Sequence, residues 1–375
     1  MNTETVKGFK DYVGEESEKR AEIKKLLVET FERYGFEPVE TPVVEYEEFV
    51  KGENEKDEAV SDIFKLQDKG KRKLALRYEF TFQLKRIMKN KKLPFKRYEI
   101  GEVFRDEPTS SNRFRQFVQC DADIVGGSVK DEAEILSFVK EVLDKLGIKF
   151  KIYMNNRKLL NEILEKEKIK EKEKIIREID KLDKLSEKEI KENLKKFKAE
   201  KILEIFQKPK EFFKKYNSYK EIEELEKYLK FYNIDLEFSP SLARGLSYYN
   251  GTVFEIKTSE MKETITSGGS YFFNGVQCTG ISFGLDRISS LAKLNLKKEK
   301  YLVVSLEKDK EAINLASKLR RKNVVSMFYG KPSKALDFAN SYNYNKVIFV
   351  GEKEVKNKKF KVKDMVSGKE SLLKI

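Results

Sequence analysis

The sequence predicts an α+β protein in which an antiparallel-sheet core is interrupted by a helical insertion and followed by a small α/β domain. Residues 97–104 and 114–125 have the alternating pattern of two antiparallel strands. Residues 158–230 are rich in Lys and Glu, with Leu and Ile at helical spacing. Residues 301–375 alternate strand-like and helix-like segments. We therefore expect four consecutive parts, of which the first and third form one core: 1–157, 158–235, 236–297 and 298–375.

The first part is expected to begin with a helix. Apolar residues recur at helical spacing through residues 15–34, and Gly35 ends the pattern. Residues 36–44 contain two prolines among β-branched residues, which indicates extended chain. A short strand is expected at 75–77, followed by a helix at 81–89.

The later parts have different patterns. The insertion is expected to contain several short helices around a small core, because no heptad pattern persists in it. Residues 243–290 return to Gly-rich, strand-like sequence. The last part predicts a mainly parallel sheet. Its expected elements are strands at 301–306, 324–329 and 346–350 and helices at 309–321 and 334–343.

Composition excludes several kinds of active site. The chain has no histidine, so a Ser-His-Asp or Cys-His system, a His-ligated metal and imidazole base catalysis are all ruled out. The two cysteines, Cys120 and Cys278, form no CxxC pair, which favours a reducing, cytoplasmic setting. We find no signal-like start and no stretch of about 18 apolar residues, and expect a soluble protein without a membrane segment.

Charge is unevenly distributed along the chain. The net charge is +14, but residues 1–150 carry 29 basic and 31 acidic groups. Residues 301–375 carry 17 basic and 8 acidic groups, and residues 151–235 carry 24 and 19. This asymmetry suggests that two modules face a polyanion. A charged surface that merely increases solubility remains the alternative.

The predicted strand pair carries the first chemical motif. Three arginines, Arg105, Arg113 and Arg115, lie on both sides of the connection 106–113, and Phe117 follows them. The connection is longer than a tight hairpin needs, and long loops often carry function. Arginine forks beside an aromatic ring suit a polyphosphate joined to a base. Surface ion pairs on a hairpin are the alternative.

Two further motifs follow the insertion. Arg244 stands between small residues and precedes Tyr248 and Tyr249, which is compatible with a pocket or with ordinary strand packing. Residues 267–271 and 280–287 are Gly-rich, which permits close approach of backbone to a ligand. No Walker-type phosphate loop occurs in the sequence.

Together these segments resemble the class II aminoacyl-tRNA synthetases, and within that class the histidyl-tRNA synthetase family. The segments similar to motifs 1, 2 and 3 are 34–45 (YGFEPVETPVVE), 104–107 with 113–117 (FRDE and RFRQF), and 280–287 (GISFGLDR). The segments similar to histidine-specific signatures are 244–255 (RGLSYYNGTVFE) and 268–271 (GGSY), with support from 76–81 (LRYEFT) and 180–184 (DKLDK). The resemblance implies a class II catalytic core that ligates histidine to tRNA(His) through a histidyl-adenylate, releasing AMP and pyrophosphate.

The resemblance also implies roles for individual residues. For ATP, Arg105 would hold the α-phosphate, Arg113 and Arg287 the outer phosphates, Glu107 the adenine amino group, and Phe117 would stack on the ring. Arg244 would act with Arg105 as a catalytic residue beside the α-phosphate. The histidine-binding residues would be Glu79, Phe80, Thr81, Arg105, Gln119, Asp123, Arg244, Tyr248, Tyr249 and Tyr271, with Glu79 and Thr81 receiving the ammonium.

Further expectations concern partners. Mg²⁺ would accompany ATP without a dedicated protein cage, residues 298–375 would bind the anticodon through the basic cluster 318–322, and motif 1 would form a homodimer interface. Activity that titrates near pH 6 to 7 would belong to bound histidine or to a phosphate. The chain departs from the family pattern at Ser247, Ser270, Phe272 and Asp286 and within the 106–113 loop.

Two alternatives are a histidine-sensing regulatory subunit of ATP phosphoribosyltransferase and a Lys-rich nucleic-acid-binding protein without chemistry. The first usually lacks the last domain and the Arg244 signature. The second would not explain a charge-neutral core with arginines at three separate sites.

Overall fold

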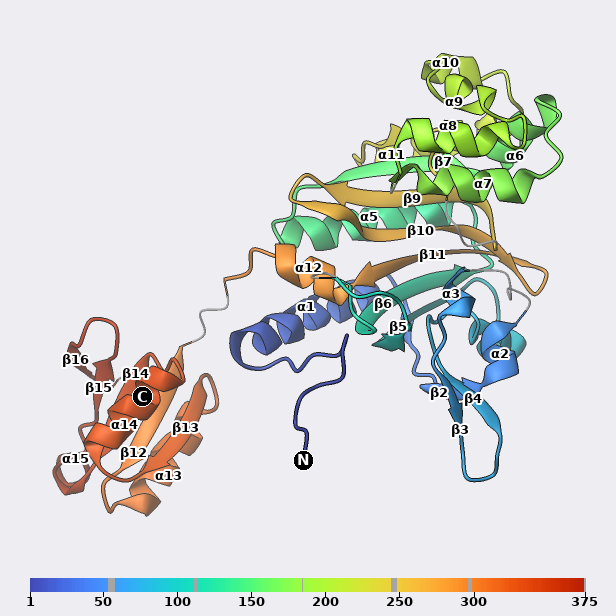
Figure 1. Cartoon of the computed structure of the whole chain (residues 1–375). Helices are drawn as coiled ribbons and strands as arrows, with labels where there is room; N and C mark the ends of the chain where they lie inside the picture. Colours follow the sequence, from blue (N-terminus) through green and yellow to red (C-terminus); the bar gives the residue numbers. More distant parts are fainter. Residues whose placement is uncertain (53–57, 111–112, 184, 244–247, 296–298, 374–375) are drawn as a thin grey trace. The chain divides into compact units, whose positions relative to one another are not determined.

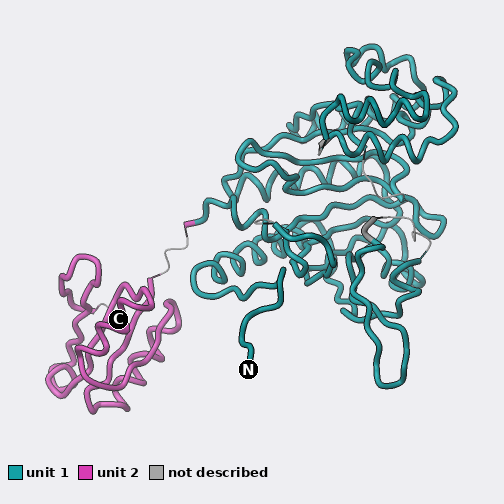
Figure 2. Tube along the Cα trace, in the orientation of Figure 1, with its two compact units in different colours: residues 1–294 teal, residues 295–375 magenta. Residues whose placement is uncertain are grey.

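The computed structural model describes residues 1–52, 58–110, 113–183, 185–243, 248–295 and 299–373 (Figure 1). The chain divides into two compact units, Met1–Leu294 and Asn295–Ile375 (Figure 2). No helix in the described ranges is long and apolar enough to cross a membrane.

The centre of the first unit is a mixed sheet. Within the described part of this unit eight strands pair in the order β1-β5-β6-β11-β10-β9-β7-β8. Every pair is antiparallel except β1 with β5 and β7 with β8, which confirms the predicted antiparallel core. The strands are β1 (Glu37–Pro38), β5 (Phe95–Phe104), β6 (Gln116–Val125), β7 (Lys151–Asn156), β8 (Glu237–Phe238), β9 (Tyr249–Thr258), β10 (Met261–Phe273) and β11 (Val276–Gly284).

Three helices pack with this sheet around its apolar core: α1 (Gly14–Arg33), α5 (Val129–Lys145) and α12 (Leu285–Leu291). The expected helix at 15–34 is therefore confirmed. α5 is capped by Ser128, whose backbone amide and hydroxyl both donate to the carboxylate of Asp131 in the first turn. Because residues alternate across a strand, the even-numbered side chains Val118, Cys120, Ala122 and Ile124 of β6 face this core. The odd-numbered side chains of β6 then face the opposite side, where the site lies.

The insertion is helical, as predicted. Its elements are α6 (Arg157–Lys166), α7 (Lys172–Asp180), η2 (Lys181–Asp183), α8 (Glu187–Lys195), α9 (Lys201–Phe206), α10 (Lys210–Phe213) and α11 (Tyr219–Phe231). Their buried side chains, such as Ile176, Ile190 and Leu225, belong to the same continuous core as Ile152 and Met154 of β7. The apolar interior of these helices therefore continues into that of the sheet.

A small sheet of β2 (Val44–Tyr46), β4 (Lys73–Leu76) and β3 (Lys65–Gln67) lies beside the large one, in the order β2-β4-β3. The short helices near it are α2 (Glu47–Lys51), α3 (Glu58–Ser61), α4 (Leu84–Ile87) and η1 (Met88–Asn90). The expected helix at 81–89 was placed three residues too early, since α4 begins at Leu84. The carbonyl oxygen of Phe80, which an earlier helix would use, instead accepts a hydrogen bond of 3.0 Å from Arg97.

The second unit is a small α/β domain. In its described residues β13 (Val324–Tyr329), β12 (Lys300–Ser305) and β14 (Lys346–Val350) are parallel, as predicted. β15 (Lys361–Asp364) and β16 (Glu370–Leu372) add an antiparallel edge that the sequence pattern did not indicate. Apolar side chains of α13 (Asp309–Leu319) and α14 (Pro332–Ser341) pack into two separate clusters, so the helices cover opposite faces of the sheet. α15 (Glu352–Asn357) follows β14.

Candidate active site

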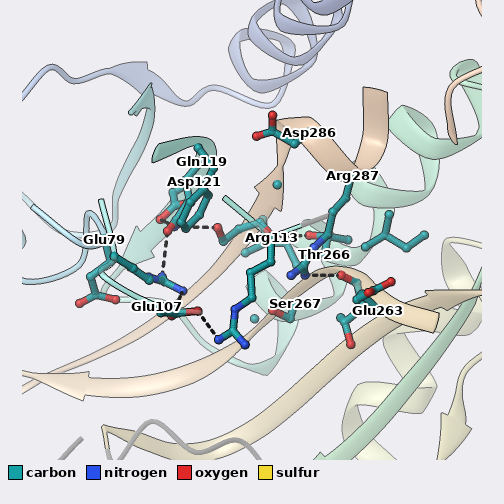
Figure 3. Close-up of a pocket in the computed structure, with 18 of the residues that line it drawn as sticks. Glu79, Glu107, Arg113, Gln119, Asp121, Glu263, Thr266, Ser267, Asp286 and Arg287 are labelled. Carbon is teal, nitrogen blue, oxygen red and sulfur yellow. Dashed lines mark hydrogen bonds and ion pairs between the residues drawn. The ribbon is translucent and has the colours of Figure 1, made fainter. Parts of the chain in front are cut away.

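A cavity of about 1040 Å³ opens on the face of the large sheet that the core helices leave uncovered. Its walls come from β6, β9, β10, β11, the start of α12, the 106–113 loop and the segment before α4. Figure 3 shows acidic and basic side chains from these elements converging on the cavity. The segments similar to motifs 2 and 3 therefore meet Tyr248, Tyr249 and Tyr271 of the histidine signatures in one place, although they are far apart in the sequence, whereas the motif 1 segment 34–45 contributes no residue to the lining.

Strand register arranges the cavity floor in rows. Gln119 of β6 lies between Gly101 and Gly284, and Asp121 lies between Glu99 and Ser282. A third row consists of Arg97, Asp123 and Gly280. β6 thus supplies three polar groups to the floor, and three of the six residues paired with them are glycines, Gly101, Gly280 and Gly284.

Gly280 makes room for the third row. A Cβ atom at this position would lie 2.0 Å from Oδ1 of Asp123 and 2.8 Å from its Cγ. Asp123 is held by Tyr271 and Arg97, so its carboxylate cannot move aside without breaking these contacts. The glycine in the 280–287 motif is therefore needed for the Asp123 side chain to occupy its place.

Buried acids and phenols gather at one end of the cavity. Glu79 accepts hydrogen bonds from Thr81 at 3.2 Å and from Tyr248 at 3.4 Å. Asp123 accepts one from Tyr271 at 2.6 Å and pairs with the fully buried Arg97 at 2.7 Å. This end can therefore bind a cation beside Glu79 and a polar ring beside the Asp123–Tyr271 pair.

Burial changes the acidity of these groups. Desolvation raises the pKa of Glu79 to about 7, against an opposing effect of Arg105. Desolvation likewise raises the pKa of Asp121 to about 7, and it raises the pKa of Asp123 despite the Arg97 charge. A cationic ligand bound beside these carboxyls would favour their ionised form and so lower their pKa values.

Arginines and an aromatic ring lie at the other end. Arg105 donates to the carbonyl of Tyr78 at 3.1 Å and to Oε1 of Gln119 at 3.0 Å, and its guanidinium lies 5.1 Å from the ring centroid of Phe117. Arg113 forms an ion pair with Glu107 (Figure 3). These groups suit a phosphate chain bound next to a stacked base.

Arg287 enters the cavity from the first turn of α12. It donates to the carbonyl of Thr264 at 2.7 Å, which directs it across β10. The preceding residue, Asp286, accepts a hydrogen bond from the backbone amide of Val118 at 3.3 Å. Motif 3 is thereby connected to β6, the strand that carries the cavity floor.

Comparison with known proteins identifies the family. The family model described as histidyl-tRNA synthetase matches residues 8–288. A protein named histidine–tRNA ligase 2 from Shouchella clausii is 34% identical, and the match covers 98% of this chain and 97% of that protein. The histidine–tRNA ligase of Methanocaldococcus jannaschii is also 34% identical, with 98% and 97% covered. The chain belongs to the histidyl-tRNA synthetase family.

Solved structures agree with the family assignment. The histidyl-tRNA synthetase from Nostoc sp. PCC 7120 superposes with a TM-score of 0.85 at 25% identity, covering 100% of this chain and 97% of that one. A Bacillus halodurans protein described as an ATP phosphoribosyltransferase regulatory subunit/histidyl-tRNA synthetase gives 0.78 at 22% identity, with 92% and 98% covered. The second likeness shows the fold alone, so the family rests on the sequence matches.

Most residues predicted from the family resemblance line the cavity: Glu79, Thr81, Arg105, Glu107, Arg113, Phe117, Gln119, Asp123, Tyr248, Tyr249, Tyr271 and Arg287. Phe80 does not, because it is fully buried with its ring 4.7 Å from the Arg77 guanidinium. The assignment of Phe80 to histidine binding therefore stays a prediction that the position of its side chain does not support. Arg244 and Ser247 lie outside the described residues.

Asp121 was not predicted from the sequence, although it lies on the cavity floor. Its carboxylate accepts from Nε2 of Gln119 at 3.1 Å, and this fixes the Gln119 amide so that Oε1 faces Arg105. The two-residue period of β6 indicates Asp121 as clearly as Gln119 and Asp123. Three further residues line the cavity: Ser282, Thr264 and Thr266. Apart from lying near or within the Gly-rich motifs, nothing in the sequence indicated that they belong to the site.

The departures from the family pattern have separate surroundings. Ser270 is buried, and its side chain is hydrogen-bonded to the buried Glu132 of α5. The side chain of Thr252 is hydrogen-bonded to the same carboxyl group. Phe272 is exposed. Pro108, Thr109 and Ser110 of the 106–113 loop line the cavity. Asp286 is held by Arg20 at 2.7 Å in addition to its bond from Val118.

Proposed function

We propose that this cavity activates histidine with ATP and transfers it to tRNA(His), which is the reaction of the family. The observation that carries the proposal is the division of one cavity into an acidic, phenolic end and an end rich in arginine. Activation begins when the histidine carboxylate attacks the α-phosphorus and displaces pyrophosphate. That carboxylate is already ionised at neutral pH, so this step needs alignment and charge stabilisation and no general base.

In this proposal the acidic end binds the amino acid. The ionised Glu79 pairs with the ammonium, assisted by Thr81. Asp123 and Tyr271 approach the imidazole, which has one donor and one acceptor nitrogen, and Tyr248 and Tyr249 complete the pocket. An apolar analogue would leave these buried polar groups unpaired and be rejected.

The arginine end binds ATP in this proposal. Arg105 faces the α-phosphate, because Gln119 and the Tyr78 carbonyl fix its guanidinium between the two ends of the cavity. Phe117 stacks on adenine and Glu107 accepts from its amino group, while Arg113 and Arg287 bind the outer phosphates. Arg244 is assigned beside the α-phosphate from its motif.

We propose that Mg²⁺ enters with the outer phosphates of ATP. Mg²⁺ commonly binds through one or two carboxylates together with substrate phosphates. Glu263 lines the cavity and fits that donor set. The described residues contain no cluster of three or more acidic or Cys side chains arranged for a metal. When bound, the ion would neutralise charge on the pyrophosphate leaving group.

The second unit is proposed to bind the anticodon of tRNA(His). Its excess of basic residues supplies the attraction to phosphates. The helical insertion between the two core segments would approach another part of the same tRNA.

We also propose a homodimer that works in the cytoplasm. Val43, Val44 and Tyr46 of the motif 1 region and Leu66 of β3 are exposed apolar residues on the small sheet. Neighbouring apolar residues of this kind mark an interface. Both cysteines are free and buried, which suits a reducing compartment. A sedimentation measurement of mass tests the dimer.

The function is tested by exchange of labelled pyrophosphate into ATP. We expect exchange that depends on histidine, and loss of about 100-fold in rate for Arg105→Ala and Arg244→Ala, by analogy with removal of one electrostatic donor. Arg33→Ala, which removes an exposed guanidinium paired with Glu141, is the control and should leave the rate unchanged. Histidine binding without any exchange would instead indicate a histidine sensor.

A further inference from the structure

A segment outside the motifs lies against the ATP end of the cavity. The carbonyl oxygen of Gly8 accepts hydrogen bonds from the backbone amides of Arg115 at 2.8 Å and Gln116 at 3.3 Å. Phe9 packs edge-on against Phe64, with ring centroids 6.1 Å apart. Residues 8–12, which we call the 8–12 segment, are therefore attached to the chain just after the 106–113 loop and to Phe64.

Gly8 has no room for a side chain. Its φ of +88° lies in the region that favours glycine. A Cβ atom there would lie 2.8 Å from Cγ of Arg115 and 2.9 Å from Cγ2 of Thr109. Both neighbours belong to the predicted ATP-binding hairpin, so the backbone at Gly8 packs directly on it.

Arg115 transmits this contact to the loop. Its Nε donates to the carbonyl of Glu107 at 3.2 Å, and its guanidinium pairs with Asp106 at 3.0 Å. Its own carbonyl accepts from the amide of Arg105 at 2.9 Å. A displacement of Arg115 would therefore move the backbone of both Arg105 and Glu107.

The other end of the 8–12 segment holds motif 3. The Tyr12 hydroxyl donates to Oδ1 of Asp286, and Arg20 of α1 donates to the same oxygen at 2.7 Å. The Arg20 guanidinium also lies 3.7 Å from the centroid of the Tyr12 ring. Because Asp286 also accepts from the amide of Val118, these contacts fix the first turn of α12, from which Arg287 enters the cavity.

We propose that Gly8 and Tyr12 are positioning residues for ATP: the 8–12 segment connects the motif 2 hairpin to motif 3 and sets the spacing between Arg105, Glu107 and Arg287. The inference rests on the proposed function. The contacts of the 8–12 segment reach the ATP end of the cavity, and among the described residues none of them is with Glu79, Asp123 or Tyr271. Disturbing the segment therefore weakens ATP binding selectively.

The first test compares Gly8→Ala with Gly14→Ala in histidine-dependent pyrophosphate exchange by the full chain. Gly14 also has a positive φ, +57°, but an added Cβ would meet nothing within 4 Å. In both variants the alanine must adopt a positive φ, which is strained, but only in Gly8→Ala does the added Cβ atom collide with Arg115. We expect Gly8→Ala to raise the KM for ATP about fivefold or more, with the KM for histidine within about twofold, and Gly14→Ala to change neither.

The second test is Tyr12→Phe, which removes one hydroxyl and keeps the ring beneath Arg20. It should raise the KM for ATP about threefold at unchanged KM for histidine, with a thermal midpoint close to that of the parent. Lys7→Ala, an exposed change next to Gly8, is its control.

Equal increases in both KM values, or an unchanged KM for ATP in both Gly8→Ala and Tyr12→Phe, would overturn the proposal. Absence of histidine-dependent exchange in the parent protein would overturn the proposed function instead, so the two failures are distinguishable.

Discussion

The raised pKa of Glu79 predicts how histidine affinity depends on pH. With a pKa of about 7, roughly nine tenths of the free protein carries an ionised Glu79 at pH 8, and roughly one tenth does at pH 6. The bound ammonium favours the ionised form, so binding releases a proton. The contribution of Glu79 to affinity therefore falls about tenfold as the pH drops from 8 to 6.

The variant Glu79→Gln isolates this effect. Gln keeps the shape and loses the charge, and a missing partner for a buried cation weakens binding by about 100-fold. We expect the ratio of KM for histidine, variant over parent, to be about 100 at pH 8 and about 10 at pH 6. The ratio cancels the titration of histidine itself, because both proteins bind the same ligand. Pyrophosphate exchange at saturating ATP measures it.

A matched control is Glu132→Gln. Glu132 is equally buried, and desolvation raises its pKa to about 7, but it lies outside the residues that line the cavity. It should leave the KM for histidine unchanged at both pH values. A Glu79→Gln ratio that does not vary with pH would refute the assignment of Glu79 as the titrating partner of the ammonium.

Three further predictions follow from the geometry. Because the pKa of Glu132 is raised in the folded state, its protonation stabilises the fold fully below about pH 4.5, and this stabilisation is lost as the pH rises through 7. The free energy of unfolding of Glu132→Gln, relative to that of the parent, should therefore increase by up to about 3 kcal/mol between pH 5 and pH 8. Equal shifts of the thermal midpoint at both pH values would contradict this. Gly280→Ala should raise the KM for histidine about tenfold by displacing Asp123, and an unchanged KM would show that the strand adjusts. Deletion of 295–375 should reduce tRNA charging and its salt dependence while pyrophosphate exchange persists; loss of exchange with tRNA binding retained would contradict the proposed domain roles.

The sequence was most informative where one strand carries a repeating pattern. The alternation in 97–104 and 114–125 predicted the antiparallel pairing of β5 with β6, whereas Gln119 and Asp123 were named only from the family resemblance. Asp121 obeys the same period and was missed, because a family motif draws attention only to the positions it contains. The pattern itself was therefore a better guide to the cavity floor than the motif.

Long-range contacts explain what the sequence could not predict. The helix expected from residue 81 starts at Leu84, because a buried arginine 17 positions away binds the carbonyl of Phe80. Likewise, the contacts of Tyr12 with Asp286 join residues 274 positions apart, and no local propensity reports such a pairing.

Absence of histidine does not deprive the protein of groups that titrate near neutral pH. The sequence predicted that titration between pH 6 and 7 would belong to the substrate or a phosphate. The structure adds two candidates to these, because burial raises the pKa values of Glu79 and Asp121 to about 7. Carboxyls in a desolvated pocket thus reach the range that imidazole has in water. The charge of the pocket therefore responds to pH through its own acids, and a bound histidine ammonium would oppose that response by favouring their ionised form.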